Sequence, residues 1–126
     1  MNNRTDNLQR RKLAEKRGRR AETLATWLLT LKGYRILDTR LQTPHGEIDI
    51  IAAKGKTLAI VEVKSRATIE LAKEALHTAN LSRIEEAAYY YQAKRQNLEH
   101  HTIRFDAVFV TKGLRTKHVK DAWRGY

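Results

Sequence analysis

Two acids and one lysine stand in short apolar segments where charged side chains are unusual. Asp49 lies within Gly46–Ala53, and Glu62 and Lys64 lie within Thr57–Arg66. Both segments are rich in β-branched residues and are joined by a glycine-containing loop, which is typical of an antiparallel hairpin. Buried carboxylates need a compensating positive charge. Because a hard cation such as Mg²⁺ prefers oxygen ligands, the pattern predicts an ion held by Asp49 and Glu62.

The alternation of side chains along a strand predicts how these groups are arranged. With the loop centred at 54–55, Asp49 is expected opposite Ile60, and Asp49 and Glu62 share one face. The two acids are then diagonal neighbours with Cα atoms roughly 7 to 8 Å apart, so both carboxylates can reach one cation. A slip of one residue would move Asp49 to the other face. A salt bridge between Glu62 and Lys64 on an exposed sheet face is the alternative.

This combination resembles the core of the PD-(D/E)xK nucleases, the restriction-endonuclease-like superfamily. The longer string Gly46–Ala52 followed by Val61–Arg66, with Gly33–Leu37 ahead of it, is similar to the small bacterial YraN family. That family is itself similar to archaeal Holliday-junction resolvases. The resemblance covers most of residues 13 to 110. The proline usual before the first acid is Ile48 here, a departure that the YraN-like proteins share.

The resemblance implies roles for individual residues. Asp49 and Glu62 would bind Mg²⁺ or Mn²⁺, and Lys64 would hold the attacking hydroxide and screen the phosphate. In resolvase-like nucleases a glutamate of the first helix often joins the metal site, and Glu22 lies in a segment that matches in order and spacing. The alternative for Glu22 is a surface pair with a basic neighbour on the same helix. The implied substrate is DNA, extending to branched or structured DNA, and a homodimer is implied because such relatives often act as symmetric pairs.

Length and composition bound the class of protein. The chain has 126 residues, 41% of them hydrophobic and 31% charged, which fits one soluble domain. It has no cysteine, so a disulfide framework and a thiolate metal site are excluded. No apolar run reaches the ~20 residues of a membrane span, and the polar N-terminus lacks a signal-peptide core, so a cytoplasmic location is expected. We expect a disordered tail over residues 1–9 and a single nuclease-like domain over 10–126.

The charge balance favours a polyanionic partner. Lys and Arg number 25 against 14 Asp and Glu, a formal net charge of +11. Nucleic acid is favoured over membrane because no segment joins a basic face to a large aromatic face. From Arg10 to Arg20 seven of eleven residues are basic, which predicts an arm that contacts phosphates; a solvated helix start is the alternative. The candidate nucleic-acid contacts are Arg10, Arg11, Lys12, Lys16, Arg17, Arg19, Arg20, Arg40, Arg66 and Arg83.

Periodicity predicts the order helix, three strands, helix and two strands. The first helix should start near Arg10, end near Lys32-Gly33 and carry an apolar stripe. The stripe residues are Ala21, Leu24, Ala25, Leu28 and Leu31. The remaining predicted elements are strands at 34–41 and 103–110, an edge strand at 116–122, and helices at 70–76 and 80–97, besides the hairpin. This order predicts a three-layer α/β sandwich with a central mixed sheet flanked by helices. Asp106, central in a β-prone run, is expected to make structural hydrogen bonds.

Three functional hypotheses follow. The first is a metal-dependent endonuclease that hydrolyses phosphodiester bonds of DNA. The second is a nucleic-acid-binding protein that keeps the nuclease scaffold without the chemistry. The third, an RNA-binding basic protein, explains the charge but not the pair of acids.

Overall fold

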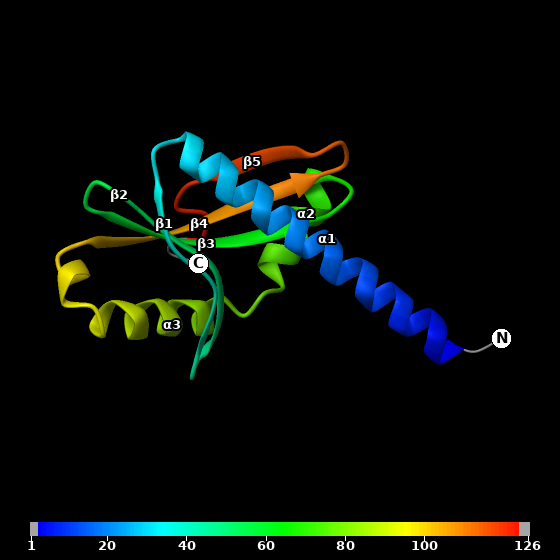
Figure 1. The fold of residues 1–126 in the computed structure, drawn as a ribbon, viewed down its shortest axis with the longest axis horizontal. Helices are drawn as coiled ribbons and strands as arrows, with labels where there is room; N and C mark the ends of the chain where they lie inside the picture. The colour runs from blue at the N-terminus through cyan, green and yellow to red at the C-terminus, as the bar shows by residue number, and fades with distance from the viewer. Residues whose placement is uncertain (1–2, 124–126) are drawn as a thin grey trace.

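A five-stranded sheet forms the middle layer of the molecule, and helices cover both of its faces (Figure 1). The structure is a computed structural model that describes residues 3–123. In chain order the elements are α1 (Asn3–Leu31), β1 (Arg35–Thr43), β2 (Gly46–Lys54), β3 (Thr57–Ser65), α2 (Ile69–His77), α3 (Leu81–Ala93), the 3-10 turn η1 (Gln96–Leu98), β4 (Thr102–Thr111) and β5 (Arg115–Val119). The predicted three-layer sandwich is confirmed.

The sheet follows the order of the strands in the chain, β1-β2-β3-β4-β5. Only β3 and β4 are parallel, and the other neighbours are antiparallel. The parallel pair requires a long crossover, which α2 and α3 supply on one face of the sheet. The mixed sheet was therefore predictable from the long connection between the third and fourth strands.

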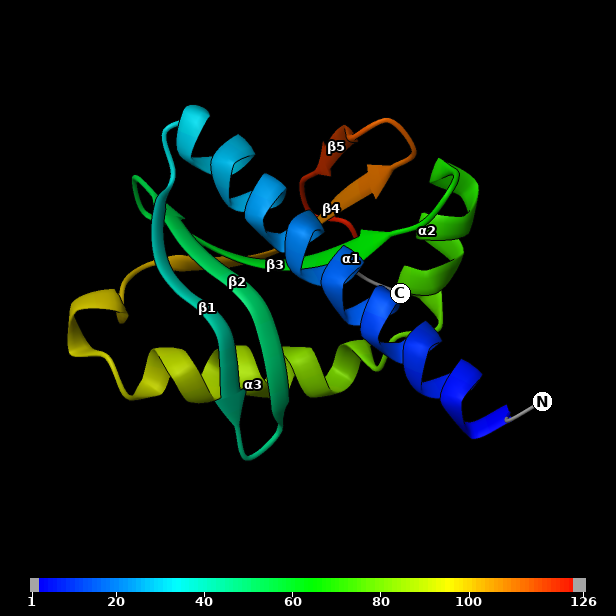
Figure 2. The ribbon, with the colours of Figure 1, turned by 45° about the vertical axis from the view of Figure 1, so that its right-hand side comes forward.

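Each face of the sheet has its own hydrophobic cluster. On one face Leu58, Ile60 and Phe109 pack with residues of α2 and α3. On the other face Val61 and Val108 pack with residues of α1 (Figure 2). Since successive side chains of β3 alternate between these clusters, both faces are apolar, as expected for a strand covered on both sides.

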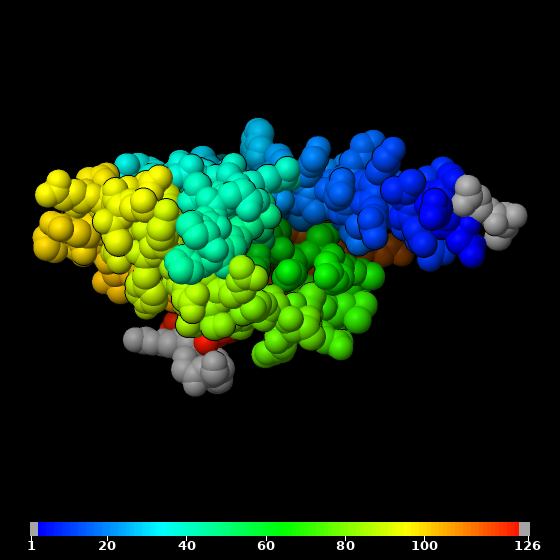
Figure 3. Space-filling view, turned by 90° about the horizontal axis from the view of Figure 1, so that it is seen from below, coloured from blue at the N-terminus to red at the C-terminus, as the bar shows by residue number. Residues whose placement is uncertain are grey.

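Helix α1 is longer than predicted and its buried stripe is shifted. It begins at Asn3, so the segment predicted as a disordered tail is helical from residue 3, and residues 1–2 lie outside the described part. Its buried residues are Ala21, Ala25 and Leu29, whereas Leu31 of the predicted stripe is 83% exposed. The N-terminal end of the helix projects beyond the rest of the molecule (Figures 1 and 3). Only the C-terminal part of α1 is therefore held by packing.

The end of α1 is fixed by its backbone. Gly33 adopts a φ of +92°, and its N–H donates to the Thr30 carbonyl while the Tyr34 N–H donates to the Leu29 carbonyl. This pair of bonds is the Schellman ending that the Lys32-Gly33 pattern predicts. It turns the chain directly into β1. Two other predicted ends were too long, because α3 ends at Ala93 and β5 ends at Val119.

No helix in the described residues 3–123 is both long and apolar enough to cross a membrane.

Candidate active site

The β2–β3 hairpin carries the two acids, in a register that differs from the predicted one. A two-residue turn, Gly55 and Lys56, brings Lys54 opposite Thr57 and Ile50 opposite Val61. The prediction of Asp49 opposite Ile60 is therefore wrong by two residues, because the turn starts one residue later than assumed. An even shift does not invert the pleat, so the two acids stay close together. Continuing the register by one pair brings Asp49 level with Glu62 instead of diagonal to it.

Asp49 is fixed at the point where the hairpin pairing stops. The last paired residues are Ile50 and Val61. Beyond them, Oδ2 of Asp49 accepts a hydrogen bond of 2.8 Å from the Val63 backbone N–H. Ile48 packs in the α3-side cluster and Ile50 in the α1-side cluster, although a regular strand would place them on one face. The alternation of side chains along β2 is therefore interrupted at Asp49. There the Asp49 carboxylate, in place of a backbone carbonyl, accepts the hydrogen bond from the Val63 N–H.

Glu62 is almost completely buried, with 9% of its surface exposed. Burial, then the hydrogen bond and the charge repulsion with Asp49, raise the pKa of Glu62 to about 9, and only the charge of Lys64 and the Val63 backbone oppose this. The two carboxyl groups therefore hold one proton between them at neutral pH. Such a pair is stabilised in its fully ionised form only by an added positive charge.

Glu22 faces the two acids from α1 but has its own counter-charge. Arg40 Nε donates to both oxygens of Glu22, at 3.0 and 3.2 Å. Burial raises the pKa of Glu22, the Arg40 hydrogen bond lowers it, and the nearby charge of Asp49 raises it again. Glu22 therefore lies within electrostatic reach of Asp49. Arg40, a predicted phosphate contact, adopts a left-handed φ of +50° and pairs with Glu22 instead of standing free.

All four predicted catalytic residues line one open cavity of about 460 Å³ between α1 and the ends of β2 and β3, here called the acid pocket. The predicted four are Asp49, Glu62, Lys64 and Glu22, and Arg17, Ser65 and Arg66 also line the pocket. The structure thus brings together residues of α1, such as Arg17 and Glu22, with residues of β2 and β3 that lie far from them in the chain. The hairpin pattern predicted that Asp49, Glu62 and Lys64 lie close together, and the family resemblance predicted that Glu22 joins them.

The donor set of the acid pocket fits a magnesium-like ion. Within residues 3–123 no three His, Cys, Asp or Glu side chains are gathered so as to hold a metal ion by themselves. Mg²⁺ is commonly held by one or two carboxylates and completes its shell with water and phosphate oxygens. Asp49 and Glu62 supply two such carboxylates, and their shared proton is what a cation would displace. The fit rests on these two acids, with Glu22 nearby.

The predicted nucleic-acid contacts fall into three groups. The seven basic residues from Arg10 to Arg20 are all exposed on α1, and Arg17 among them reaches the acid pocket together with Arg66. Arg40 pairs with Glu22. Arg83 lies on α3, where its Nε donates to the His45 carbonyl at 2.8 Å, so it holds the β1–β2 turn and does not line the acid pocket.

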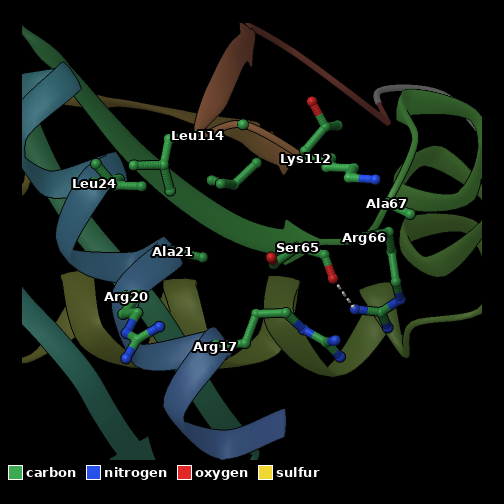
Figure 4. A pocket seen from close by; sticks show the side chains of 12 residues that line it. Arg17, Arg20, Ala21, Leu24, Ser65, Arg66, Ala67, Lys112 and Leu114 are labelled. Carbon is green, nitrogen blue, oxygen red and sulfur yellow. Dashed lines mark hydrogen bonds between the residues drawn. The ribbon is translucent and has the colours of Figure 1, made fainter. Parts of the chain in front are cut away.

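A second cavity, of about 300 Å³, adjoins the acid pocket and shares Arg17, Ala21, Ser65 and Arg66 with it (Figure 4). We call it the leucine-arginine pocket. Its further lining includes Arg20 and Leu24 of α1, and Lys112 and Leu114 of the β4–β5 turn. Leu24 was predicted only as part of the apolar stripe of the first helix, and Lys112 and Leu114 were not predicted as site residues. The feature of the sequence that could have indicated Leu114 is a leucine that directly follows the turn-forming pair Lys112-Gly113.

Asp106 lies apart from both pockets and is structural, as expected. It is fully buried and receives two hydrogen bonds from Arg104, one from the Asp121 backbone N–H, and a 2.8 Å contact with His118 Nε2. Burial raises its pKa, but these hydrogen bonds outweigh burial and leave the pKa below the ordinary value. Asp106 therefore ties β4 to β5 and to the chain that follows.

Comparison with known proteins places the chain in a family. The model of the uncharacterised protein family UPF0102 matches residues 21–110. A UPF0102 protein of Caulobacter vibrioides (strain NA1000 / CB15N) is 46% identical over 112 residues, which cover 89% of this chain and 90% of the relative. A UPF0102 protein of Parvibaculum lavamentivorans is 44% identical over 85% of this chain and 80% of the relative. UPF0102 protein Mmar10_3014 of Maricaulis maris is 43% identical over 90% of this chain and 89% of the relative. These names state no activity.

Proposed function

We propose that this chain, which belongs to the uncharacterised protein family UPF0102, the YraN family, is a metal-dependent endonuclease that hydrolyses phosphodiester bonds of DNA. The observation that carries the proposal is that half-buried Asp49 and buried Glu62 lie together beside Lys64 in an open pocket, where burial and Asp49 raise the pKa of Glu62 to about 9. A purely structural carboxyl pair would be closed off or paired with arginine. This pair instead faces a cavity lined by arginines.

The proposal assigns each side chain a task. Asp49 and Glu62 would hold Mg²⁺ or Mn²⁺, and Glu22 would be the third carboxylate near the ion. The bound ion would supply a water of lowered pKa and neutralise charge on the phosphate. Asp49 is already oriented by the Val63 N–H, so its free oxygen is fixed before any ligand binds.

Lys64 places a positive charge next to Glu62, and this charge partly opposes the rise in the pKa of Glu62 that burial and Asp49 cause. A compact ammonium in a partly buried position can hold a nucleophile and screen the phosphate. Arg17 and Arg66 line the same pocket and would bind the substrate phosphates through forked hydrogen bonds. The exposed basic residues of α1 would bind neighbouring phosphates of the backbone without reading sequence.

A cleavage assay tests the proposal. The purified protein is incubated with labelled linear, flapped and four-way DNA in Mg²⁺, in Mn²⁺ and in EDTA, beside Asp49→Asn, Glu62→Gln and Lys64→Met. Glu74→Gln, an exposed acid of α2 that does not line the acid pocket, is the matched control. We expect metal-dependent cleavage by wild type and control and a loss of at least about 100-fold in the three site variants, with binding retained.

The same assay separates the alternatives. Binding of DNA without cleavage of any substrate in either metal would favour a binding protein on a nuclease scaffold. Strong preference for RNA over every DNA would favour an RNA-binding protein. Cleavage that survives in both Asp49→Asn and Glu62→Gln would show that the acid pocket is not the active site.

A further inference from the structure

The leucine-arginine pocket has two chemically different ends. Figure 4 shows Leu24 and Leu114 together at one end and Arg17 and Arg66 together at the other. Ala21 of α1 lies between them and adds to the apolar wall. A ligand that fills this cavity therefore needs a flat or compact apolar part and an anionic part a few ångströms away.

The floor of this pocket is joined by backbone hydrogen bonds. The Arg66 N–H donates to the Val110 carbonyl at 3.1 Å, and the Lys112 N–H donates to the Ala67 carbonyl at 3.4 Å. These bonds join the chain just beyond the parallel strands β3 and β4. The crevice outside the carboxyl ends of parallel strands is a common ligand site in open α/β sheets. The pocket thus lies just beyond the carboxyl ends of the parallel pair, where a ligand site is expected on physical grounds.

The charge of the pocket is uniformly positive. Arg17, Arg20, Arg66 and Lys112 line it, and no acid does. Across residues 3–123, no ion pair joins any of these four side chains to an Asp or Glu. Cations left without an acidic partner around an apolar wall match a ligand that carries phosphate.

Leu114 is the unusual member of the apolar wall. It is 67% exposed and adopts a left-handed φ of +60°, which leucine rarely does. An exposed leucine held in a strained backbone gains no stability from burial. Such a residue is more readily explained by contact with a ligand than by folding.

We propose that the leucine-arginine pocket receives one unpaired nucleotide of DNA, directly next to the phosphodiester bond presented to the acid pocket. The base would pack against Ala21, Leu24 and Leu114, and its phosphate would lie between Arg17 and Arg66, which line both pockets. This inference rests on the proposed function and names its substrate class: DNA with an unpaired nucleotide beside the cleaved bond.

The size of the cavity argues for an unpaired nucleotide over a base pair. About 300 Å³ is at the lower limit of small-ligand pockets and suits one nucleoside. A base within a duplex is stacked on both faces and paired at its edge, so it can enter such a cavity only when it leaves the helix. Single-stranded DNA offers bases that are already free to pack on an apolar wall.

The test measures binding in EDTA, so that it does not depend on cleavage. Fluorescence anisotropy compares a labelled oligodeoxythymidylate, a blunt duplex of equal length and the same duplex with a single-stranded bulge. The full-length protein is used as wild type and as Leu114→Ala, Leu114→Phe and Leu31→Ala. The last is the matched control, because Leu31 is an exposed leucine of α1 that does not line the pocket.

We expect wild type to bind the single strand and the bulge more tightly than the blunt duplex. Leu114→Ala should weaken binding of the single strand and the bulge about fivefold and change duplex binding less than about twofold, whereas Leu114→Phe should tighten the first two by stacking. Leu31→Ala should bind all three as wild type does.

The inference is overturned if wild type binds the blunt duplex as tightly as the single strand, or if Leu114→Ala weakens all three probes equally. Preference for oligouridylate RNA over oligodeoxythymidylate would overturn the assignment to DNA. A protein that cleaves DNA but shows no such selectivity would refute this inference alone. A protein that shows the selectivity but cleaves nothing would refute the proposed function alone.

Discussion

Replacing Glu62 with glutamine should stabilise the protein at neutral pH while abolishing the proposed cleavage of DNA. Glu62 is buried beside Asp49, and its neutral form is strongly favoured in the folded state. Glutamine has the same shape and is always neutral, and its amide can donate to the Asp49 carboxylate as a protonated carboxyl does. Glu62→Gln therefore avoids the loss of folding free energy that the ionisation of Glu62 causes in wild type as the pH rises.

The direction and size of the effect follow from the pKa of Glu62, which rises from 4.5 to about 9 on folding. Between these values the folded protein binds more protons than the unfolded chain, so wild-type stability falls as the pH rises. The maximum slope for one proton is about 1.4 kcal/mol per pH unit. From pH 6 to pH 8, Glu62→Gln should therefore gain up to about 3 kcal/mol over wild type.

Urea unfolding at pH 6, 7 and 8 in EDTA measures this difference from the midpoints and slopes. Glu74→Gln serves as control, because it removes an exposed acid of α2 away from the acid pocket and should follow the wild-type dependence on pH. If Glu62→Gln and wild type lose stability in parallel from pH 6 to pH 8, Glu62 is ionised without metal, and the argument from the shared proton is refuted.

Three further predictions concern other contacts. Mg²⁺ should raise the melting temperature of wild type more at pH 8 than at pH 6, because the ion needs ionised Glu62, and Asp49→Asn should show no such rise in a thermal scan. A double-mutant cycle of Glu22→Gln and Arg40→Gln should give a coupling of only about 0.5–1 kcal/mol in urea unfolding, since Arg40 is 39% exposed; a coupling above about 2 kcal/mol would contradict this. Asp106→Asn should cost about 3–5 kcal/mol at pH 7 because Arg104 loses its buried partner. The difference from wild type should shrink as the pH falls below 3.8, because Asp106 of the unfolded chain is protonated there before Asp106 of the folded protein, whose pKa is lower. An Asp106→Asn variant as stable as wild type at pH 7 would show that this network is not stabilising.

The hairpin shows how far local pattern reaches. Alternating β-branched residues around a glycine predicted two strands with Asp49 and Glu62 close together, because side-chain direction has a period of two. The register itself was wrong by two residues, since it depends on which residues form the turn, and Gly55 with a φ of +57° places Gly55 and Lys56 there. Asp49 and Glu62 still lie close together, because a shift of two residues leaves each side chain on the same face of its strand.

The sequence by itself determined which chemical groups were present and which segments were strands or helices. Charge, apolar period and the acids of the hairpin are local properties, so Asp49, Glu62, Lys64 and the basic part of α1 could be named without coordinates. Only the tertiary structure decided the partner and protonation of each group. Arg40 reaches Glu22 across 18 residues, and burial keeps the proton on Glu62.

The leucine-arginine pocket also belongs to the tertiary structure alone. Its walls come from α1, from the chain beyond β3 and from the β4–β5 turn, and no periodicity links Leu24 with Leu114. Packing of distant segments sets which side chains share a cavity and how far water reaches them. The neighbours of a side chain in its cavity and its exposure to water control its charge state and the ligands that it can bind. Neither property is encoded in a short stretch of sequence.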